Sequence, residues 1–509
     1  MFRGHNTMSN TRQSSAVDGE WKITSTPSIV SVSVCLSIGE VKEALEAEQP
    51  LATSFRSPGP IVDEKLRLIL DQSITTHSAC IVFHAKRTET TETMTDQVHL
   101  RDNLQPPSTR EELRDFFRDY GDAFVSSRAT GGEYNAVLTY YAATKEEQSQ
   151  LSSSMRAAGI FTGANIDASL QANLNRFNSS QNIHNRVSFA QNIFGVQGDV
   201  NLPNMESLIA FANAFPSMPL HADSIVAQSF LGYEHVPEIA SKFASIARNR
   251  DLLIHFPSIG AFLAFQNDVN YIKRVYELYG AYGRDTRLMQ VKREVDEDAQ
   301  AIGEAVKAFD LDPTDALIRL PSLNSLNSGT PSMHFSSHME VSPNFGEEVG
   351  RLTNGSRPFE VPALAHSIEA YARQETSVSE VQILWNDFRI SGLGVTYTNV
   401  NKGGTLSLIH GGSGAENSSK MELLASHSLQ SFDSLIWTDG VPRPIISQLS
   451  IKRSDNVEIV GAGLYPMGSR LTWTVPDGYF VLGFQGHESG FLGRFEVVCG
   501  SCLPTSWTI

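Results

Sequence analysis

The chain has 509 residues, which is enough for two or three domains with a core in each. Hydrophobic residues make up 41% of it and charged residues 19%, as is typical of a globular protein. The formal net charge of −16 argues against a nucleic-acid partner, because nucleic-acid binding needs basic patches and the sequence shows none. The same charge argues against docking on anionic lipid by electrostatic attraction.

The cysteines and the apolar runs exclude further classes. Four cysteines in a chain of this length do not make a disulfide framework, and the pair Cys499 and Cys502 near the C-terminus has no strand–helix unit after it. We therefore expect a structural role for that pair. The sequence contains no run of about eighteen apolar residues, so it predicts no transmembrane helix. The polar N-terminus lacks the apolar region of a secretory signal. The expectation is a chain that is soluble when made, with any export by a non-classical route and membrane association on target cells.

The first hundred residues predict a mixture of short strands and helices. Residues 1–20 are polar and are predicted to be disordered. Strict alternation over 29–38 predicts a half-buried strand. Apolar spacing predicts short helices over 41–48 and 62–72. The apolar run 81–85 predicts a short strand that gives way to a polar, threonine-rich segment.

A helix over 108–119 follows, with Ser108 and Glu111 as a capping box. It leads into a short motif that organises the rest of the chain. The motif consists of an aromatic residue and a glycine, a second aromatic residue, and a glycine pair: Tyr120, Gly121, Phe124, Gly131 and Gly132. On local physics alone, paired glycines after a β-prone run predict a hairpin corner or a backbone that must be approached closely.

The spacing of this motif resembles the signature of the membrane attack complex/perforin superfamily of pore-forming proteins. The resemblance implies an α+β domain over 21–330, with a bent central antiparallel sheet and flanking helical clusters. It further implies that Gly131 and Gly132 act as conformational joints beside a segment that inserts into membranes. The segment 233–237 is similar to the one that closes the domain core in that superfamily.

Downstream of the motif lies the longest alternating pattern in the chain, over 160–174. Its even positions carry apolar or small residues, namely Ile160, Thr162, Ala164, Ile166, Ala168, Leu170, Ala172 and Leu174. A strand that crosses a bilayer needs roughly 9–11 residues with one apolar face, and this segment has that length and pattern. A long strand over a soluble core, or a small-residue helix in the soluble form, gives the same pattern.

Its place in the sequence matches the second membrane-inserting segment of the superfamily. The polar run 176–186 would form the tip of a hairpin and 187–196 the returning strand. The first inserting segment is expected within 50–100, where no comparable lipid-facing pattern is found.

Helices are predicted over 205–215, 269–279 and 287–309, the last from one apolar stripe. The Ser-, Asn-, Gly- and Pro-rich stretch that follows predicts a linker over 331–358. His334 and His338 lie four residues apart without a supporting carboxylate motif, so no metal site is expected.

The region 359–509 predicts an all-β domain of seven or more short strands separated by glycine-rich turns. Together, 390–414 and 478–498 resemble the jacalin-related lectins, which implies a β-prism. The sugar-binding loop of that family corresponds here to Gly490, Phe491, Leu492 and Arg494. Arg494 stands where the family has an aspartate, and a guanidinium only donates hydrogen bonds whereas a carboxylate accepts them.

Two functional hypotheses follow. In the first, the chain is a pore-forming cytolysin that binds a membrane lipid or glycan receptor through its lectin-like domain, assembles into a ring with other copies of itself, and inserts β-hairpins. In the second, it is a non-lytic carbohydrate-binding or adhesion protein that uses the same scaffold for assembly. No phosphate loop, dinucleotide fingerprint, nucleophile elbow or zinc-protease motif is present, so neither an enzymatic activity nor a cofactor is expected.

Overall fold

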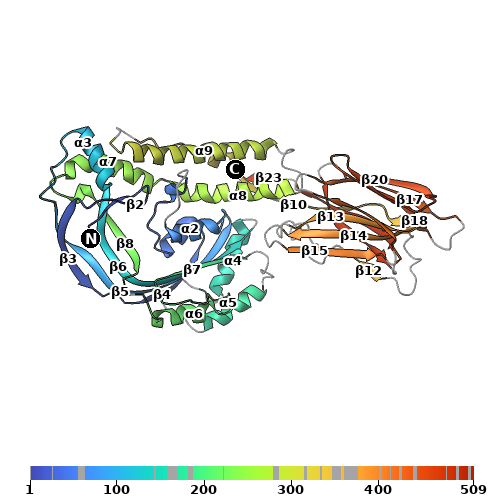
Figure 1. The fold of residues 1–509 in the computed structure, drawn as a ribbon, viewed down its shortest axis with the longest axis horizontal. Coiled ribbons are helices and arrows are strands. Elements are labelled where there is room, and N and C mark those ends of the chain that lie inside the picture. The colour runs from blue at the N-terminus through green and yellow to red at the C-terminus, as the bar shows by residue number, and fades with distance from the viewer. Residues whose placement is uncertain are drawn as a thin grey trace. The chain divides into compact units, whose positions relative to one another are not determined.

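The computed structural model describes the chain in two compact units, one of Met1–Asp268 with Arg293–Ser328 and one of Val269–Lys292 with Gly329–Ile509 (Figure 1). Every structural statement below concerns the described residues. These are 2–25, 27–55, 63–142, 145–157, 160, 169–180, 187–221, 223–278, 286–314, 318–332, 335–346, 357–359, 376–399, 404–412, 414–423, 427–439, 444–476, 479–488, 492–502 and 506–508.

The first unit is built on one curled antiparallel sheet. Its strands are β1 (Gly4–Asn6), β2 (Thr11–Arg12), β3 (Val17–Thr24), β4 (Ile29–Cys35), β5 (Ser78–Leu100), β6 (Ala123–Tyr141), β7 (Val187–Phe194) and β8 (Ile225–Gly232). Its α-helices are α1 (Ile38–Ala44), α2 (Glu64–Asp71), α3 (Arg110–Tyr120), α4 (Lys145–Ala157), α5 (Ser169–Ser180), α6 (Leu208–Ala214) and α7 (Ala240–Ile254). Short 3₁₀ turns are η1 (Leu51–Phe55), η3 (Phe215–Ser217), η4 (Tyr233–His235) and η6 (Asn324–Ser328).

Two long strands, β5 and β6, pair with each other from Ser78 opposite Tyr141 to Thr93 opposite Ser127. Each is flanked by two short strands placed end to end. On one side β4 pairs with 80–86 of β5 and β3 with 91–100. On the other side β7 pairs with 133–140 of β6 and β8 with 123–130. The sheet therefore has two halves that share only β5 and β6.

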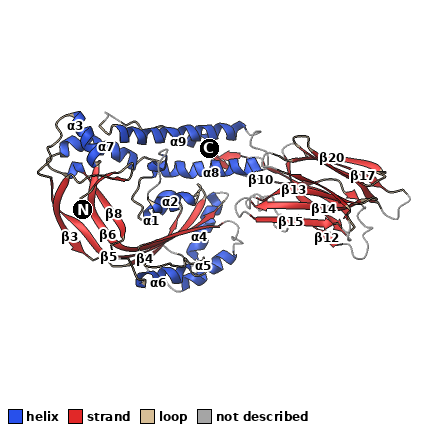
Figure 2. Cartoon of the chain, in the orientation of Figure 1, coloured by secondary structure: helices blue, strands red, loops and turns tan. Residues whose placement is uncertain are grey.

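One half of the sheet is covered by helices on both faces, and we call it the helix-covered half (78–86 of β5 and 133–141 of β6). Because side chains alternate along a strand, successive residues face opposite helices. Figures 1 and 2 show α1 and α2 inside the curl of the sheet, with α5 and α6 outside it. The outer face forms one core with α4, α5 and α6, made of Ala79, Ile81, Phe83, Ala85, Tyr134, Ala136, Leu138 and Tyr140 with Leu151, Met155, Leu174 and Ile209.

The other half is covered by the N-terminal segment, and we call it the N-terminus-covered half (90–100 of β5 and 123–130 of β6). Strand β1 pairs with β6 and with β2. Phe2, Met8 and Ala16 are buried. The prediction of disorder for 1–20 is wrong, because these apolar residues, although spread among polar neighbours, pack onto the sheet.

Two other sequence predictions need correction in this unit. The strand expected over 81–85 continues through the threonine-rich run to Leu100, because that run pairs with β3 and β6 on both sides. The helix α3 is present, but its capping box uses Thr109 and Glu112, one residue later than expected.

Helices α8 (Ile259–Leu278) and α9 (Thr286–Leu311) complete the helical part. The apolar stripe predicted for α9 is confirmed, since its members Leu288, Val291, Val295, Ile302, Val306 and Phe309 are all buried. None of the helices in the described ranges is long and apolar enough to cross a membrane.

The second unit consists of β-strands in three main sheets. Their strands are β10 (Phe335–Val341), β11 (Phe345–Gly346), β12 (Arg357–Phe359), β13 (Thr376–Trp385), β14 (Ile390–Asn399), β15 (Gly404–Gly411), β16 (Asn417–Glu422), β17 (Leu429–Trp437), β18 (Ile445–Arg453), β19 (Glu458–Ala462), β20 (Ser469–Thr474), β21 (Tyr479–Glu488) and β22 (Leu492–Cys502). A separate two-stranded pair joins β9 (Thr330–Ser332) to β23 (Ser506–Thr508).

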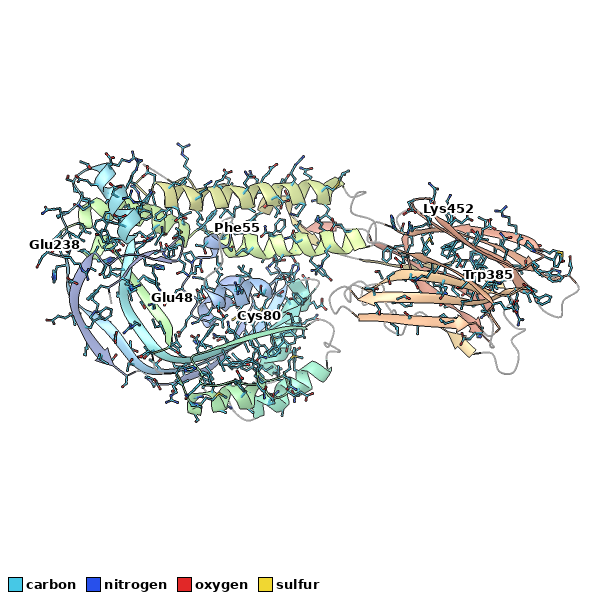
Figure 3. All side chains as sticks on the ribbon, viewed as in Figure 1. Glu48, Phe55, Cys80, Glu238, Trp385 and Lys452 are labelled. Carbon is cyan, nitrogen blue, oxygen red and sulfur yellow. The ribbon has the colours of Figure 1, made fainter. Side chains whose placement is uncertain are left out.

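The three sheets run in the orders β15-β14-β13-β16, β19-β18-β17-β20 and β10-β22-β21-β12 with β11 beside β22. All three contribute to one core, for example Ile383 from the first, Phe432 from the second and Phe484 from the third. Trp385, labelled in Figure 3, packs against this core from the end of β13. Three sheets around one shared core form a β-prism, as the C-terminal sequence predicts.

The expected linker over 331–358 is only partly correct. Phe335–Val341 and Phe345–Gly346 are strands that pair with β22. Phe345 is fully buried and its ring stacks on that of Phe495 at 4.9 Å, so this segment belongs to the core of the prism. The Ser- and Pro-rich composition of 331–358 gave no sign of these strands, because few residues of the segment are apolar.

Candidate functional site

The motif at 120–132 spans the junction of the two halves of β6. Gly121 ends α3 with a φ of +82°, and a Cβ at this position would collide with the carbonyl oxygen of His5. Phe124 is fully buried, and its ring lies 5.4 Å from that of Tyr233. The hydroxyl of Tyr233 donates to the carbonyl of Tyr120 at 3.2 Å. The first part of the motif therefore fixes the N-terminus-covered half.

The glycine pair lies where β6 passes from one half to the other, so it is not a hairpin corner. Gly131 has a φ of +157°, and the β5–β6 register shifts beside it, between Thr88 and Thr90. A Cβ on Gly131 would collide with the carbonyl oxygen of Arg87, and one on Gly132 would collide with the side chain of Leu220. Close backbone approach, together with a local bulge, explains why glycine is needed at both positions.

Next to the glycine pair, Glu133 joins the sheet to helix α2. Its carboxylate is fully buried, and Oε1 lies 2.7 Å from Nζ of Lys65 on α2 and 2.9 Å from Nε2 of His84 on β5. Its second oxygen, Oε2, has no hydrogen-bond partner among the described residues. We call Lys65, His84 and Glu133 the Glu133 cluster. The Glu133 cluster connects α2 to β6 beside the glycine pair through polar side chains.

Electrostatics keeps this carboxylate ionised. Burial opposes its charge, but the hydrogen bond from His84 and the positive charge of Lys65 outweigh burial and lower the pKa of Glu133 below its usual value. A second ion pair, between Lys86 on β5 and Glu46 after α1, holds the same face at 2.7 Å. Nearby, burial raises the pKa of Glu48 to about 7.

Two further contacts attach the segment between α2 and β5. Gln72, the C-cap of α2, accepts a hydrogen bond from Thr139 of β6 at 2.8 Å. Asp268 on α8 accepts from the backbone N–H of Thr76 at 3.1 Å and from its hydroxyl at 2.6 Å. Burial raises the pKa of Asp268 to about 7.

Of the 160–174 segment the structure describes Ile160 and 169–174, and Ile160, Leu170 and Leu174 belong to the core on the outer face of the sheet. Ile160 is buried in that core. Thr162, Ala164, Ile166 and Ala168 lie outside the described residues. Leu170 and Leu174 are buried on one side of α5, whereas Ala172 is exposed. In this structure 169–174 form a helix, which the pattern also allows, and not a strand over a soluble core, because an alternating pattern contains the i, i+4 spacing of a helix face. Insertion of this segment as a membrane-spanning strand stays a prediction.

The predicted sugar-binding loop lies between β21 and β22, and Gly490 and Phe491 are outside the described residues. Leu492 is buried at the start of β22. Arg494 pairs in register with His487, and its Nε and Nη1 have no hydrogen-bond partner among the described residues. Glu488, at the end of β21, accepts from the backbone N–H of Gly411 at 2.7 Å. The sequence analysis missed this carboxylate, although it lies two residues before the loop.

Sequence reasoning also missed the Glu133 cluster. Lys65, His84 and Glu133 are far apart in the sequence. The register of β5 and β6 brings His84 close to Glu133, and the placement of α2 adds Lys65. Across the described ranges, no group of three or more His, Cys, Asp or Glu side chains is arranged to hold a metal ion.

No protein-family model matches the chain, and no curated protein matches it. Solved structures of jacalin-related lectins are similar to about a third of it. The Malaysian banana lectin is 17% identical, with a TM-score of 0.24, and the match covers 33% of this chain and 99% of the lectin. A mannose-binding jacalin-related lectin from Ananas comosus is 13% identical, with a TM-score of 0.24, over 32% of this chain and 98% of that one. Artocarpin in complex with mannotriose is 13% identical, with a TM-score of 0.25, over 32% and 98%.

Proposed function

We propose that the chain is a pore-forming protein that attaches to a glycan-bearing surface through its β-prism, assembles with other copies of itself and inserts β-hairpins into the membrane. The proposal assigns it no catalytic reaction and no cofactor. The observation that carries it is the connectivity of the helix-covered half of the central sheet.

In that half, the antiparallel pairs β4–β5 and β6–β7 are each joined by a helical connection at the same end of the sheet. The connection 36–77 contains α1 and α2, and the connection 142–186 contains α4 and α5. Each is long enough for two strands of roughly 9–11 residues, the length that crosses a bilayer. If both connections refolded as strands, they would extend the four strands of this half beyond its edge as two adjacent hairpins.

This connectivity changes the expected position of the first inserting segment. The first inserting segment was expected within 50–100, but Ser78–Leu100 form strand β5 and are excluded from it. We assign the first hairpin to 36–77, whose helices α1 and α2 lie inside the curl of the sheet (Figure 1). The sequence of 36–77 shows no alternating apolar pattern. In its helices charged residues such as Lys65 lie among the buried positions.

The contacts of both connections suit release on assembly. Helix α2 is held by the Glu133 cluster, whose charges lose their buried partners once the helix moves away. In the described part of α5 the buried side chains Leu170, Leu174 and Phe177 lie on one side of the helix. In a closed ring, neighbouring hairpins satisfy the backbone hydrogen bonds that one hairpin in lipid leaves unmade.

We assign surface attachment to the prism, at the end where Glu488 meets Gly411 and where the β21–β22 loop begins. The neighbours described as mannose-binding make a hexose-containing glycan the first ligand to test. Arg494 in place of the family's aspartate predicts weaker binding of neutral sugars than in those lectins.

The test is to add the chain to erythrocytes and to dye-loaded liposomes made from their total lipid extract. The proposal expects haemoglobin and dye release, together with ring-shaped assemblies seen by electron microscopy. Binding with neither rings nor release would overturn it in favour of the non-lytic carbohydrate-binding protein. Absence of binding to either membrane would contradict both hypotheses.

A further inference from the structure

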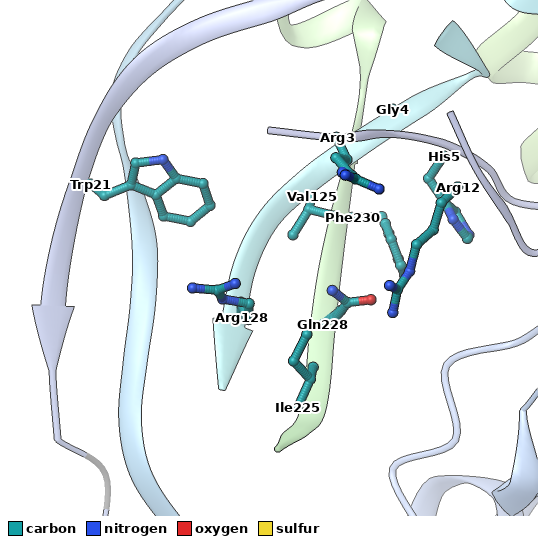
Figure 4. Close-up of a pocket in the computed structure, with 10 residues that line it drawn as sticks. All are labelled: Arg3, Gly4, His5, Arg12, Trp21, Val125, Arg128, Ile225, Gln228 and Phe230. Atoms are coloured by element: carbon teal, nitrogen blue, oxygen red, sulfur yellow. The ribbon is translucent and has the colours of Figure 1, made fainter. Parts of the chain in front are cut away.

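A cavity of about 360 Å³ lies on the N-terminus-covered half of the sheet. The N-terminal segment forms one wall and strands β3, β6 and β8 form the others (Figure 4). The residues that line it are Arg3, Gly4, His5, Arg12, Trp21, Val125, Arg128, Ile225, Gln228 and Phe230. It is separate from the bend and from both helical connections.

The cavity is positively charged in a chain whose net charge is −16. Three guanidinium groups line it, from Arg3, Arg12 and Arg128, and none of its lining residues is acidic. Arg128 forms an ion pair with Glu92 at 2.7 Å. Arg3 and Arg12 form no ion pair or side-chain hydrogen bond with the described residues. About two positive charges therefore remain without a counter-ion.

Two hydrogen-bond donors of the cavity have no partner. Nε1 of Trp21 and Nε of Arg128 are buried and unpaired within the described part of the chain. Buried N–H donors are nearly always paired, since leaving one unpaired costs on the order of 1–3 kcal/mol. A ligand with several acceptor oxygens would supply the missing partners.

The rest of the wall is uncharged and, apart from Gln228, largely apolar. Val125, Ile225 and Phe230 line it, and the ring of His5 stacks on that of Phe230 at 3.9 Å. Burial and the nearby guanidinium of Arg12 lower the pKa of His5 to about 4, so its ring is neutral at physiological pH. The cavity thus offers a cationic, donor-rich region beside a flat apolar surface.

We propose that this cavity binds a small organic phosphate, with the phosphate held by Arg3, Arg12, Arg128 and Trp21 and the apolar body placed against Phe230. A phosphate monoester carries close to two negative charges and three acceptor oxygens, which matches two unneutralised guanidinium groups and the unpaired donors. The volume of the cavity lies at the lower end of the range for small-molecule sites, roughly 300–1,000 Å³. The proposal does not depend on pore formation.

The probe is phenyl phosphate, titrated into the full-length chain by calorimetry, with phenol and benzoate as the uncharged and singly charged comparisons. We expect phenyl phosphate to bind more tightly than benzoate, and phenol not to bind. Arg12→Gln should weaken phenyl phosphate binding by about 10-fold or more, because a charge-assisted hydrogen bond is lost. Arg248→Gln, on the exposed side of α7, should leave it unchanged.

A second arm distinguishes a free phosphate ester from a lipid headgroup. Neutral vesicles with and without phosphatidic acid are co-sedimented with the chain and with the Arg12→Gln variant. Binding of phosphatidic acid vesicles that Arg12→Gln abolishes, without binding of phenyl phosphate, would assign the same site to a lipid headgroup. The proposal is overturned if neither probe binds, or if the folded Arg3→Gln/Arg12→Gln double variant binds them as the unaltered chain does.

Discussion

The two halves of the central sheet share β5 and β6 but are held in different ways. Each half pairs through its backbone with two flanking strands, β3 and β8 in the N-terminus-covered half and β4 and β7 in the other. The N-terminus-covered half is also attached by backbone pairing with β1 and by a buried carboxylate, Asp122. Asp122 accepts from the backbone N–H and the hydroxyl of Thr7 and lies 3.7 Å from Nη1 of Arg250. In the helix-covered half, helices on both faces are attached mainly by side chains.

This difference indicates which half of the sheet can release its helices. Removing the N-terminal segment would break the pairing of β1 with β6 and leave the buried carboxylate of Asp122 without its partner Thr7. Helix α2, in contrast, could leave once the Glu133 cluster and a few side-chain contacts are broken. The glycine pair lies between the halves. One pair of strands can thus combine a permanent support with a region that refolds, and the following predictions probe that division.

The largest effect is expected at Glu133. Glu133→Gln leaves Lys65 with its charge buried and without a counter-ion, so we expect the free energy of unfolding to fall by about 3–5 kcal/mol. Glu92→Gln, which removes the partner of the half-exposed Arg128 in the other half, should cost about 1 kcal/mol or less. Urea denaturation of both variants measures the difference.

A double-mutant cycle with Lys65→Met identifies the cause. If the ion pair is responsible, Lys65→Met should recover a large part of the loss caused by Glu133→Gln. Equal losses for the Glu133 and Glu92 variants, or additive effects in the cycle, would show that the halves do not differ in this respect.

The second effect is expected at the junction. Gly131→Ala places a Cβ against the carbonyl oxygen of Arg87 at a backbone angle unfavourable to side chains, so we expect a loss of about 3 kcal/mol. Gly39→Ala, within α1, meets no atom closer than Ser37 Oγ at 3.9 Å. It should be neutral or stabilise by about 0.5–1 kcal/mol, because alanine favours helix. Thermal unfolding of both variants makes the comparison, and a neutral Gly131→Ala would contradict the close approach.

A smaller effect concerns pH. Asp268 has a pKa raised to about 7, so the folded chain holds a proton that the unfolded chain, with a pKa of about 4, releases between these values. Stability should therefore fall as pH rises from about 4 through 7, by about 1.4 kcal/mol for each unit of pKa difference.

Asp268→Asn keeps an acceptor for Thr76 and removes the proton. Its melting temperature should change less between pH 5 and pH 8 than that of the unaltered chain. Asp199→Asn, at an exposed position, serves as the control and should keep the full pH dependence. The same pH dependence in both variants would show that Asp268 is not responsible.

The sequence was sufficient where local patterns determine structure. The stripe of α9, the strand alternation of the prism and the glycines of the 120–132 motif all follow from side-chain periodicity or steric demand. The pattern over 169–174 could not separate a strand over a soluble core from a helix, because Leu170 and Leu174 are compatible with both a strand face and a helix face. In this structure both belong to the core on the outer face of the sheet as part of a helix.

Features formed by distant residues could not be predicted. The Glu133 cluster joins positions 65, 84 and 133, and the phosphate cavity joins 3, 12, 21 and 128. No local pattern marks either set, because each depends on the register of long strands. The N-terminal segment looked disordered for the same reason, since β1 pairs with β6 and His5 stacks on Phe230 of β8, both far along the chain.

The central claim is that α5 leaves the sheet to insert, and a reversible cross-link tests it most directly. Gln171 on α5 donates a hydrogen bond to the carbonyl of Met205 at 3.0 Å, so a Gln171→Cys/Met205→Cys pair can be joined by a bifunctional methanethiosulfonate reagent. The control is Glu380→Cys/Lys420→Cys, which joins β13 to β16 within the prism. Dye release from liposomes is measured before and after reduction.

We expect the 171–205 cross-link to leave membrane binding intact and to block dye release until it is reduced, and the 380–420 cross-link to have no effect on release. Undiminished release by the chain cross-linked between 171 and 205 would contradict the claim that α5 inserts.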